Sequence, residues 1–435
     1  MARILFAAVA ALLVAPSLAS AKGFDLEYEV RFLPPEGIAQ VVMRIAPDAG
    51  VRVSRLDLAM PSKRYQVLAA DGALRRQGPR LLWEPPAAGG ALHYAYRIER
   101  RRGSARDALI NERFALLRGD HLFPAARLLA TRDARSRTSL RFRLPEGWSV
   151  ETPYPRRDGE VFHVDWPGRR LSRPVGWLIA GDLGVRREVI GGTQWVVAAP
   201  RGERMRRQDL LALLRILHPE LEALFGELPD KFLIVGAGKG FWRGGLSGPR
   251  SLYLHVDRPL IQEDGTSPLV HELVHSLSRI RGIQGERWIA EAFAEYYAVE
   301  LIHRAGLIGD ARRQRIWRGL ERRAAHVSSL SGGRCSGSCV AAAALELRTL
   351  DRRIRRLAPS SGGVDELTRR LARRHGTRIA PDELLAEAEA IAGAPLGPWP
   401  RRAIASRSDP EPAPRYESAS QVPMTGRPSA SWSMK

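Results

Sequence analysis

Two histidines and a glutamate lie within one short stretch, His271-Glu272-Leu273-Val274-His275. On an α-helix, residues four apart lie on the same face about one turn from each other, so both imidazoles can reach a single ion. This arrangement supplies two of the three protein ligands of a catalytic zinc and leaves a carboxylate beside the first imidazole. The spacing therefore predicts that His271 and His275 bind a metal, and that Glu272 can accept a proton from a metal-bound water.

A second stretch, Trp288-Ile289-Ala290-Glu291-Ala292-Phe293-Ala294-Glu295, offers two more carboxylates on a predicted helix. We predict that Glu291 is the third metal ligand. Glu295 lies one turn further along the same face, where it can accept a hydrogen bond from the second ring nitrogen of a ligand histidine. A solvated carboxylate at Glu295, a helix pair that binds no metal, and a closed structural zinc site are the alternatives.

Local signals define the two helices that carry these residues. Ser267 can cap the first helix and Pro268 suits its first turn, while Gly282 is expected to end it. The second helix is expected over residues 288–305, with Gly306 after its end. The first helix is anchored in a core by its apolar residues, which are Leu269, Val270, Leu273, Val274 and Leu277.

The two motifs together resemble the gluzincin metallopeptidases, and among them the glycyl aminopeptidase family, which is related to the aminopeptidase N and leukotriene A4 hydrolase family. The resemblance rests on residues 271–297 and extends more weakly to 224–229, 244–246 and 350–355. It implies a thermolysin-like zinc catalytic domain with one Zn²⁺ per chain. By the same resemblance, His271, His275 and Glu291 bind the zinc and Glu272 is the general base.

The sequence departs from the family at the segment that holds the substrate. In the relatives, an edge strand carries a glutamate that binds the free amino terminus of the substrate. The corresponding substrate-binding residues here are Gly244, Gly245, Leu246 and Ser247, with the serine in place of the glutamate. A hydroxyl group cannot neutralise an ammonium group, so we do not expect strict aminopeptidase specificity.

A second departure concerns the group that stabilises the oxyanion. Relatives carry a Tyr-x-Lys-Gly segment with a nearby tyrosine, whereas this chain has Cys335-Ser336-Gly337-Ser338-Cys339 at that point. His326, Tyr253 and Tyr297 are candidates for the missing role by residue type alone. Each of them could equally be a core or surface residue.

Cys335 and Cys339 are the only two cysteines of the chain. They are close enough in sequence to close a small disulfide in an oxidising compartment, and two unpaired thiols are the alternative. The N-terminus favours such a compartment. An apolar run over residues 4–14 and the small residues Ala19-Ser20-Ala21 predict a signal peptide, 1–21, and export to a bacterial periplasm or beyond. An uncleaved membrane anchor is the alternative.

The formal net charge is +21, from 68 Lys+Arg against 47 Asp+Glu. The arginine clusters lie on separate segments and are not interleaved with aromatic residues, which argues against a nucleic-acid platform. Electrostatic contact with an anionic membrane or cell-wall surface is one interpretation of this charge. A basic surface that is simply solvated is the other.

Periodicity predicts an α+β multidomain protein. Residues 24–30 and 140–144 alternate apolar and polar side chains, as antiparallel strands do, and residues 251–255 are a candidate edge strand. The C-terminal part has helical periodicity and the last residues are rich in Pro and Ser. The expected divisions are a β-rich N-terminal domain, 22–185, the catalytic domain, 186–330, a helical C-terminal region, 331–405, and a disordered tail, 406–435.

The sequence therefore predicts an exported zinc metallopeptidase that acts on peptide or protein substrates. One alternative is a non-catalytic binding or scaffold protein on a peptidase fold, because two of the family's motifs are missing. Another is a hydrolase of a different amide or of an epoxide, because Ser247 removes the requirement for a free amino terminus.

Overall fold

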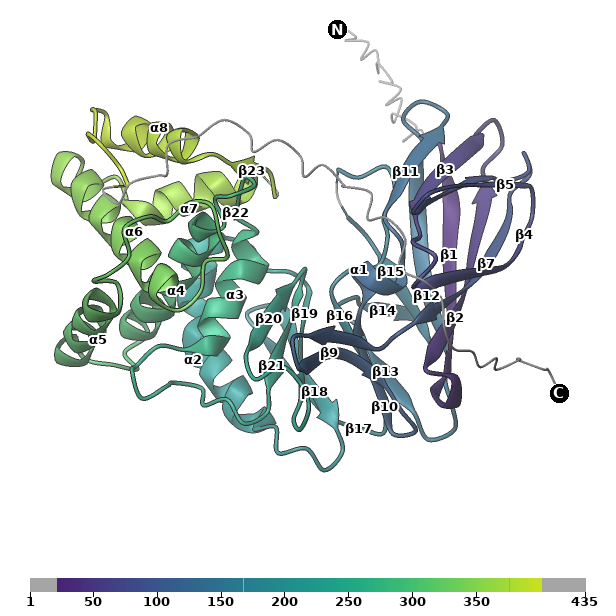
Figure 1. The fold of residues 1–435 in the computed structure, drawn as a ribbon, viewed down its shortest axis with the longest axis horizontal. Helices are drawn as coiled ribbons and strands as arrows, with labels where there is room; N and C mark the ends of the chain where they lie inside the picture. The colour runs from purple at the N-terminus through teal and green to yellow at the C-terminus, as the bar shows by residue number, and fades with distance from the viewer. Residues whose placement is uncertain (1–21, 167, 375, 401–435) are drawn as a thin grey trace, which may run out of the picture.

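The computed structural model describes residues 22–166, 168–374 and 376–400. The expected signal peptide and the expected disordered tail lie outside these ranges. The chain is a mixed α/β multidomain protein, as its periodicity predicts. In Figure 1 the β-rich N-terminal region lies at one end and the helices α2–α8 at the other, with the sheet of β17–β21 between them.

The N-terminal region consists of three sheets, in the orders β14-β15-β12-β1-β2-β7-β4, β13-β16-β10-β9-β8 and β11-β3-β6-β5. Most of the pairings are antiparallel, as expected, but β1 and β12 run parallel. A short helix, α1 (Gly119–Leu122), follows β10. The strands are β1 (Gly23–Leu33), β2 (Ile38–Pro47), β3 (Val53–Ala59), β4 (Tyr65–Ala70), β5 (Ala73–Gln77), β6 (Arg80–Glu84), β7 (Gly90–Arg97), β8 (Arg100–Arg102), β9 (Ala105–Ile110), β10 (Phe114–Arg118), β11 (Ala126–Ala130), β12 (Arg135–Arg143), β13 (Ser149–Glu151), β14 (Arg156–Asp158), β15 (Val161–Val164) and β16 (Trp177–Gly181).

The alternation that predicted these strands corresponds to one buried face. In β1, the side chains of Phe24, Leu26, Tyr28 and Val30 are buried, while the residues between them are partly or fully exposed. Because side chains of a strand point alternately to opposite faces, one face of β1 packs into the N-terminal core and the other meets solvent.

The second part of the chain is built on a mixed sheet in the order β17-β18-β19-β21-β20. Its strands are β17 (Leu183–Ile190), β18 (Thr193–Pro200), β19 (Lys231–Ala237), β20 (Gly245–Gly248) and β21 (Ser251–His255). The edge strand is β20, so the prediction that residues 251–255 form the edge is wrong. Every residue of β21 is buried, which is the pattern of a strand that has neighbours on both sides.

Helices cover one face of this sheet and share its core. They are α2 (Arg207–Phe225), α3 (Pro268–Ser278), α4 (Trp288–Arg304), α5 (Asp310–Arg323), α6 (Ser338–Leu357), α7 (Val364–Arg373) and α8 (Pro381–Ala392). One hydrophobic cluster runs from Trp195 in β18 to Trp399 after α8. Helices before and after residue 330 are therefore packed into the same core. The division expected at residue 185 falls within β17.

The helix that carries both histidines begins as predicted and ends earlier. The Ser267 side chain accepts a hydrogen bond from the Val270 N–H, and Pro268 opens the helix. The last residue of α3 is Ser278, followed by Arg279 in the left-handed conformation (φ 54°), so Gly282 is not its stop. Gly282 lies in the short strand β22 (Arg281–Gly282), where a Cβ would collide with the Glu286 backbone.

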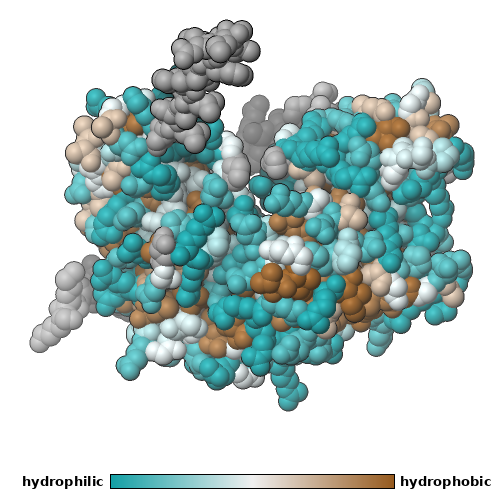
Figure 2. All heavy atoms as spheres, turned by 180° about the vertical axis from the view of Figure 1, so that it is seen from behind, coloured by the Kyte–Doolittle hydropathy of each residue, from teal (hydrophilic) through white to brown (hydrophobic). Residues whose placement is uncertain are grey.

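The two cysteines form a disulfide, with 5.1 Å between the Cα atoms of Cys335 and Cys339, at the start of α6. Within the described ranges, no helix combines the length and the apolar composition that a membrane crossing requires. The face of the molecule in Figure 2 is largely hydrophilic, which agrees with the high content of Lys+Arg.

Candidate metal centre and active site

Three side chains from two helices converge on one point. The Nε2 atoms of His271 and His275 are 3.1 Å apart, and Glu291 Oε2 lies 3.3 Å from the first and 3.6 Å from the second. One potential ligand atom from each residue lies within 4.8 Å of the others. Two imidazole nitrogens and one carboxylate oxygen are the donor set of a catalytic zinc site, so the residues present fit this metal.

The second nitrogen of His271 has its own partner. Its Nδ1 is 3.1 Å from Glu295 Oε2, and the other oxygen of Glu295 is 3.8 Å from the Arg323 guanidinium. A carboxylate at Nδ1 selects the tautomer and ring orientation that leave Nε2 free to act as a ligand. Glu295 is therefore not the solvated carboxylate of the alternative interpretation, since its side chain is only 13% exposed.

Charge interactions hold the three potential ligands together. Burial by itself would lower the pKa of His271, but hydrogen bonds to Glu291 and Glu295 outweigh it and raise this pKa well above its ordinary value. For Glu291, burial acts to raise the pKa, but the hydrogen bonds from His271 and His275 dominate and lower it strongly. The carboxylate is thus ionised and ready to act as a ligand.

Glu272 points from α3 toward the edge strand. A Cβ placed on Gly245 in β20 would lie closer to the Glu272 side chain than van der Waals contact allows. The absence of a side chain at Gly245 therefore makes room for the carboxylate. This contact places the candidate general base between the ligand helix and the strand along which a substrate could lie.

The edge strand presents alternate residues to this site. The His255 N–H donates to Gly244 O (3.1 Å), so in the antiparallel ladder Gly245 and Ser247 turn their backbone groups away from β21. Ser247 lies on the same sheet face as Gly245, because side chains repeat every second residue. Leu246 points to the opposite face and packs against the core there.

Two side chains from the N-terminal region support the edge strand. Arg118 Nη1 donates to Ser247 O (3.1 Å), and Trp177 Nε1 donates to Leu246 O (2.8 Å). Arg118 also forms an ion pair with Asp120 (2.8 Å). A guanidinium group therefore lies beside Ser247, where the relatives have a carboxylate.

None of the three candidates for the oxyanion-stabilising role has a side chain directed to the metal ligands. The Tyr253 hydroxyl donates to the Ala237 and Trp242 carbonyls. Tyr297 contacts Asp365 and Thr368. His326 is exposed beyond the end of α5.

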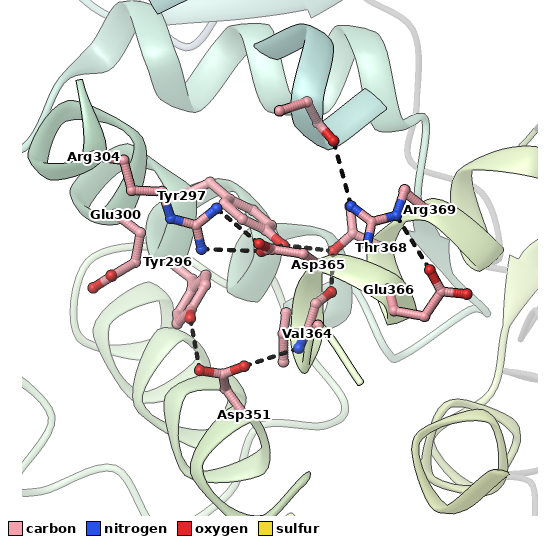
Figure 3. A network of polar contacts seen from close by, with 12 residues as sticks. Tyr296, Tyr297, Glu300, Arg304, Asp351, Val364, Asp365, Glu366, Thr368 and Arg369 are labelled. Carbon is pink, nitrogen blue, oxygen red and sulfur yellow. Dashed lines mark hydrogen bonds and ion pairs between the residues drawn. The ribbon is translucent and has the colours of Figure 1, made fainter. Parts of the chain in front are cut away.

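A buried polar network fixes α4, the helix that carries Glu291 (Figure 3). The Tyr296 hydroxyl donates to Asp351 Oδ2 on α6 (3.1 Å), and Asp351 Oδ1 accepts from the Val364 N–H at the start of α7 (2.8 Å). Arg304 on α4 forms a bidentate pair with Asp365 on α7, at 2.8 and 3.0 Å. Three helices are thus locked around the ligand helix pair.

Sequence reasoning did not find Arg118, Trp177 or Arg323. Each lies in a separate segment, far in sequence from the motif that it supports, and none belongs to a recognisable pattern. Asp351 was noted as part of a weak likeness, and its contacts with Tyr296 and α7 now give it a physical role.

No protein-family model matches this sequence, and no curated protein matches it. Solved structures do match the fold. One is an aminopeptidase N family protein from Idiomarina loihiensis, with a TM-score of 0.62 and 15% identity over 83% of this chain and 72% of that one. Another is aminopeptidase A from Legionella pneumophila, solved in complex with aspartic acid, with a TM-score of 0.53 and 12% identity over 86% of this chain.

The chain has a peptidase fold of the aminopeptidase N kind. At these identities the likeness establishes the fold alone. The match covers 48% of the Legionella enzyme, so this chain corresponds to about half of that protein. Any activity must therefore be argued from the site.

Proposed function

We propose that this chain is an exported zinc metallopeptidase of the HExxH gluzincin type, most similar to the glycyl aminopeptidases. The observation that carries the proposal is the convergence of His271, His275 and Glu291 within 4.8 Å, with Glu272 directed to the edge strand. The fold supports it, because solved proteins with this fold include aminopeptidases. Export rests on the signal peptide predicted from the sequence.

His271, His275 and Glu291 would hold one Zn²⁺. When bound there, the metal would lower the pKa of a water molecule and polarise the scissile carbonyl. Glu272 accepts the proton of the attacking water and delivers it to the leaving amine. Glu295 keeps the His271 ring in its ligand orientation. The outward backbone groups of Gly245 and Ser247 bind the substrate as an added strand.

Ser247 and Arg118 argue for substrates without a free amino terminus. No carboxylate is placed at Ser247 to neutralise an ammonium group, and the neighbouring charge is the Arg118 guanidinium, at 3.1 Å from Ser247 O. A substrate ammonium would be repelled at this point. The favoured substrates are therefore peptides that continue past Ser247 or whose amino terminus is blocked.

Metal analysis of three proteins tests the proposal. Wild type and Glu272→Gln should each contain about one zinc per chain, since the amide leaves the donor set intact. His271→Ala should contain much less. Turnover of N-terminally blocked peptides should fall by a factor of at least about 100 in Glu272→Gln, and treatment of wild type with a chelator should abolish it until zinc is restored.

A wild-type protein that takes up no zinc would contradict the proposal and favour a non-catalytic scaffold. Full turnover by Glu272→Gln with zinc bound would remove the general-base role. Faster cleavage of peptides with free amino termini than of blocked ones would contradict the specificity argued from Ser247.

A further inference from the structure

A pocket of about 710 Å³ opens between the N-terminal region and the catalytic sheet. Its walls are Trp166, from the segment between β15 and β16, the turn after β20 at Pro249 and Arg250, and the end of α3 at Ser276 and Arg279. The pocket contains none of the proposed metal ligands, and the functions described above make no use of it.

Two arginines converge on one indole in this pocket. The guanidinium carbon of Arg250 lies 4.6 Å from the centre of the Trp166 ring, and that of Arg279 lies 5.7 Å from it. The ring itself is fixed, since Trp166 Nε1 donates to Arg173 O (3.1 Å). A third arginine, Arg169, also lines the pocket.

The positive charges in the pocket are not neutralised by the protein. Within the described ranges, none of Arg169, Arg250 and Arg279 forms an ion pair within 4.0 Å, although Glu227 and Asp230 lie on the rim. Burial, followed by repulsion from Arg169, Arg281 and Arg250, lowers the pKa of Arg279. A bound anion would relieve this repulsion.

The backbone at both arginines is unusual. Arg250 has φ 51° and Arg279 has φ 54°, and Asp133 is the one further non-glycine residue with positive φ in the described part of the chain. Glycine or asparagine normally occupies such positions, because a Cβ makes the left-handed conformation unfavourable. Strain of this kind concentrates at binding and catalytic sites.

The pocket lies at the end of the edge strand. Gly245 contacts Glu272, and β20 runs from there to Gly248, a distance of about 10 Å at the rise of a strand. The turn that follows is held against α3, since Ser276 Oγ donates to Ser251 O (3.1 Å). A chain extended along β20 therefore reaches the pocket about three residues from the scissile bond.

We propose that this pocket binds a carboxylate of the substrate, so that the enzyme selects peptides with an acidic residue about three positions from the bond it cleaves. The inference rests on the proposed function and adds the substrate class. Arg250 and Arg279 form charge-assisted hydrogen bonds to the carboxylate, and guanidinium groups suit this partner because their donors match its two oxygens. The Trp166 ring holds both guanidinium groups in place.

A set of blocked hexapeptides tests the selection. Each peptide is acetylated and amidated at its ends and carries a single glutamate or glutamine at one of the six positions, with the cleaved bond located by mass spectrometry. In wild type, glutamate about three residues from the cleaved bond should raise kcat/KM about tenfold over glutamine, mainly through KM. This ratio should fall to about one in Arg279→Gln and Arg250→Gln. The control Arg318→Gln removes an exposed arginine of α5 and should keep the wild-type ratio.

Binding to Glu272→Gln by calorimetry supplies a second readout that needs no turnover. The glutamate peptide should bind about tenfold more tightly than its glutamine counterpart, and Arg279→Gln in the same background should remove the difference. If neither peptide is cleaved by wild type but selective binding persists, the peptidase function fails and the pocket stands.

Equal kcat/KM and equal affinity for the two peptides in wild type would overturn the pocket's role without affecting the peptidase function. The role would also be overturned if Arg279→Gln and Arg250→Gln lowered the melting temperature but kept full selectivity, because the two arginines would then only clamp Trp166.

Discussion

At the scale of single residues, the site depends on what surrounds the ligands as much as on the ligands themselves. Glu295 orients His271, with 3.1 Å between its carboxylate and Nδ1. The missing side chain of Gly245 gives Glu272 the space it occupies. The position of the candidate base is therefore determined by a glycine on another element.

We expect Gly245→Ala to separate metal binding from catalysis. The added methyl group would meet Glu272, so the carboxylate must move and kcat should fall by a factor of about 10 to 100, while zinc content stays at the wild-type value. Elemental analysis and kcat for a blocked peptide measure the two effects. Gly333→Ala is the matched control, since a Cβ there meets no atom within 4 Å. Unchanged kcat in Gly245→Ala would show that Glu272 is placed by other contacts.

At the scale of elements, two helices must hold their relative position to within a fraction of an ångström for three ligands to converge. Helix α3 carries the two histidines and α4 carries Glu291. The network of Figure 3 ties α4 to α6 and α7 through Asp351 and Asp365. These two carboxylates replace water as partners for buried donors, so losing one leaves several donors unsatisfied.

Asp351→Ala should lower the free energy of unfolding by about 2–4 kcal/mol, because the Tyr296 hydroxyl and the Val364 N–H lose a buried acceptor and Arg355 loses its ion pair. Urea denaturation monitored by circular dichroism measures it. Asp209→Ala removes an ion pair of which both partners are more than half exposed, with Arg206 57% and Asp209 56%, and should change stability by less than about 0.5 kcal/mol. Similar effects in the two variants would contradict the role assigned to the network.

At the scale of the whole molecule, a buried ion pair joins the N-terminal region to the catalytic sheet. Lys231 on β19 is 3.0 Å from Glu151 on β13, and their side chains are only 5% and 3% exposed. Arg187 on β17 pairs with the same carboxylate. Burial lowers the pKa of Lys231, and the charge of Glu151 opposes this effect. The docking of the two regions, and with it the pocket at Trp166, depends on this contact.

Glu151→Gln should lower the free energy of unfolding by about 3–5 kcal/mol, because the buried Lys231 ammonium loses its counter-charge. The double variant Glu151→Gln/Lys231→Met should recover most of the loss, since it removes the stranded charge as well. Thermal unfolding of the single and double variants measures the coupling. If the single variant were as stable as wild type, the pair would not contribute to docking.

Local sequence determined the parts of this protein that depend on short-range geometry. Helical periodicity places His271 and His275 on one face, a serine and a proline start the helix, and the alternation of β1 identifies its buried face. The third ligand, Glu291, was predicted from its spacing within a known pattern, and the structure brings it to the histidines. Such features follow from repeats of 3.6 and 2 residues, which neighbours in the chain already define.

Tertiary structure decided everything that depends on segments distant in sequence. Strand order made β20 the edge and put β21 inside, and α3 ended at Arg279 before Gly282 was reached. The contacts of Arg118 with Ser247 and of Arg250 with Trp166 join residues that are 129 and 84 positions apart. No local periodicity encodes such pairs, because they result from the packing of whole elements against one another.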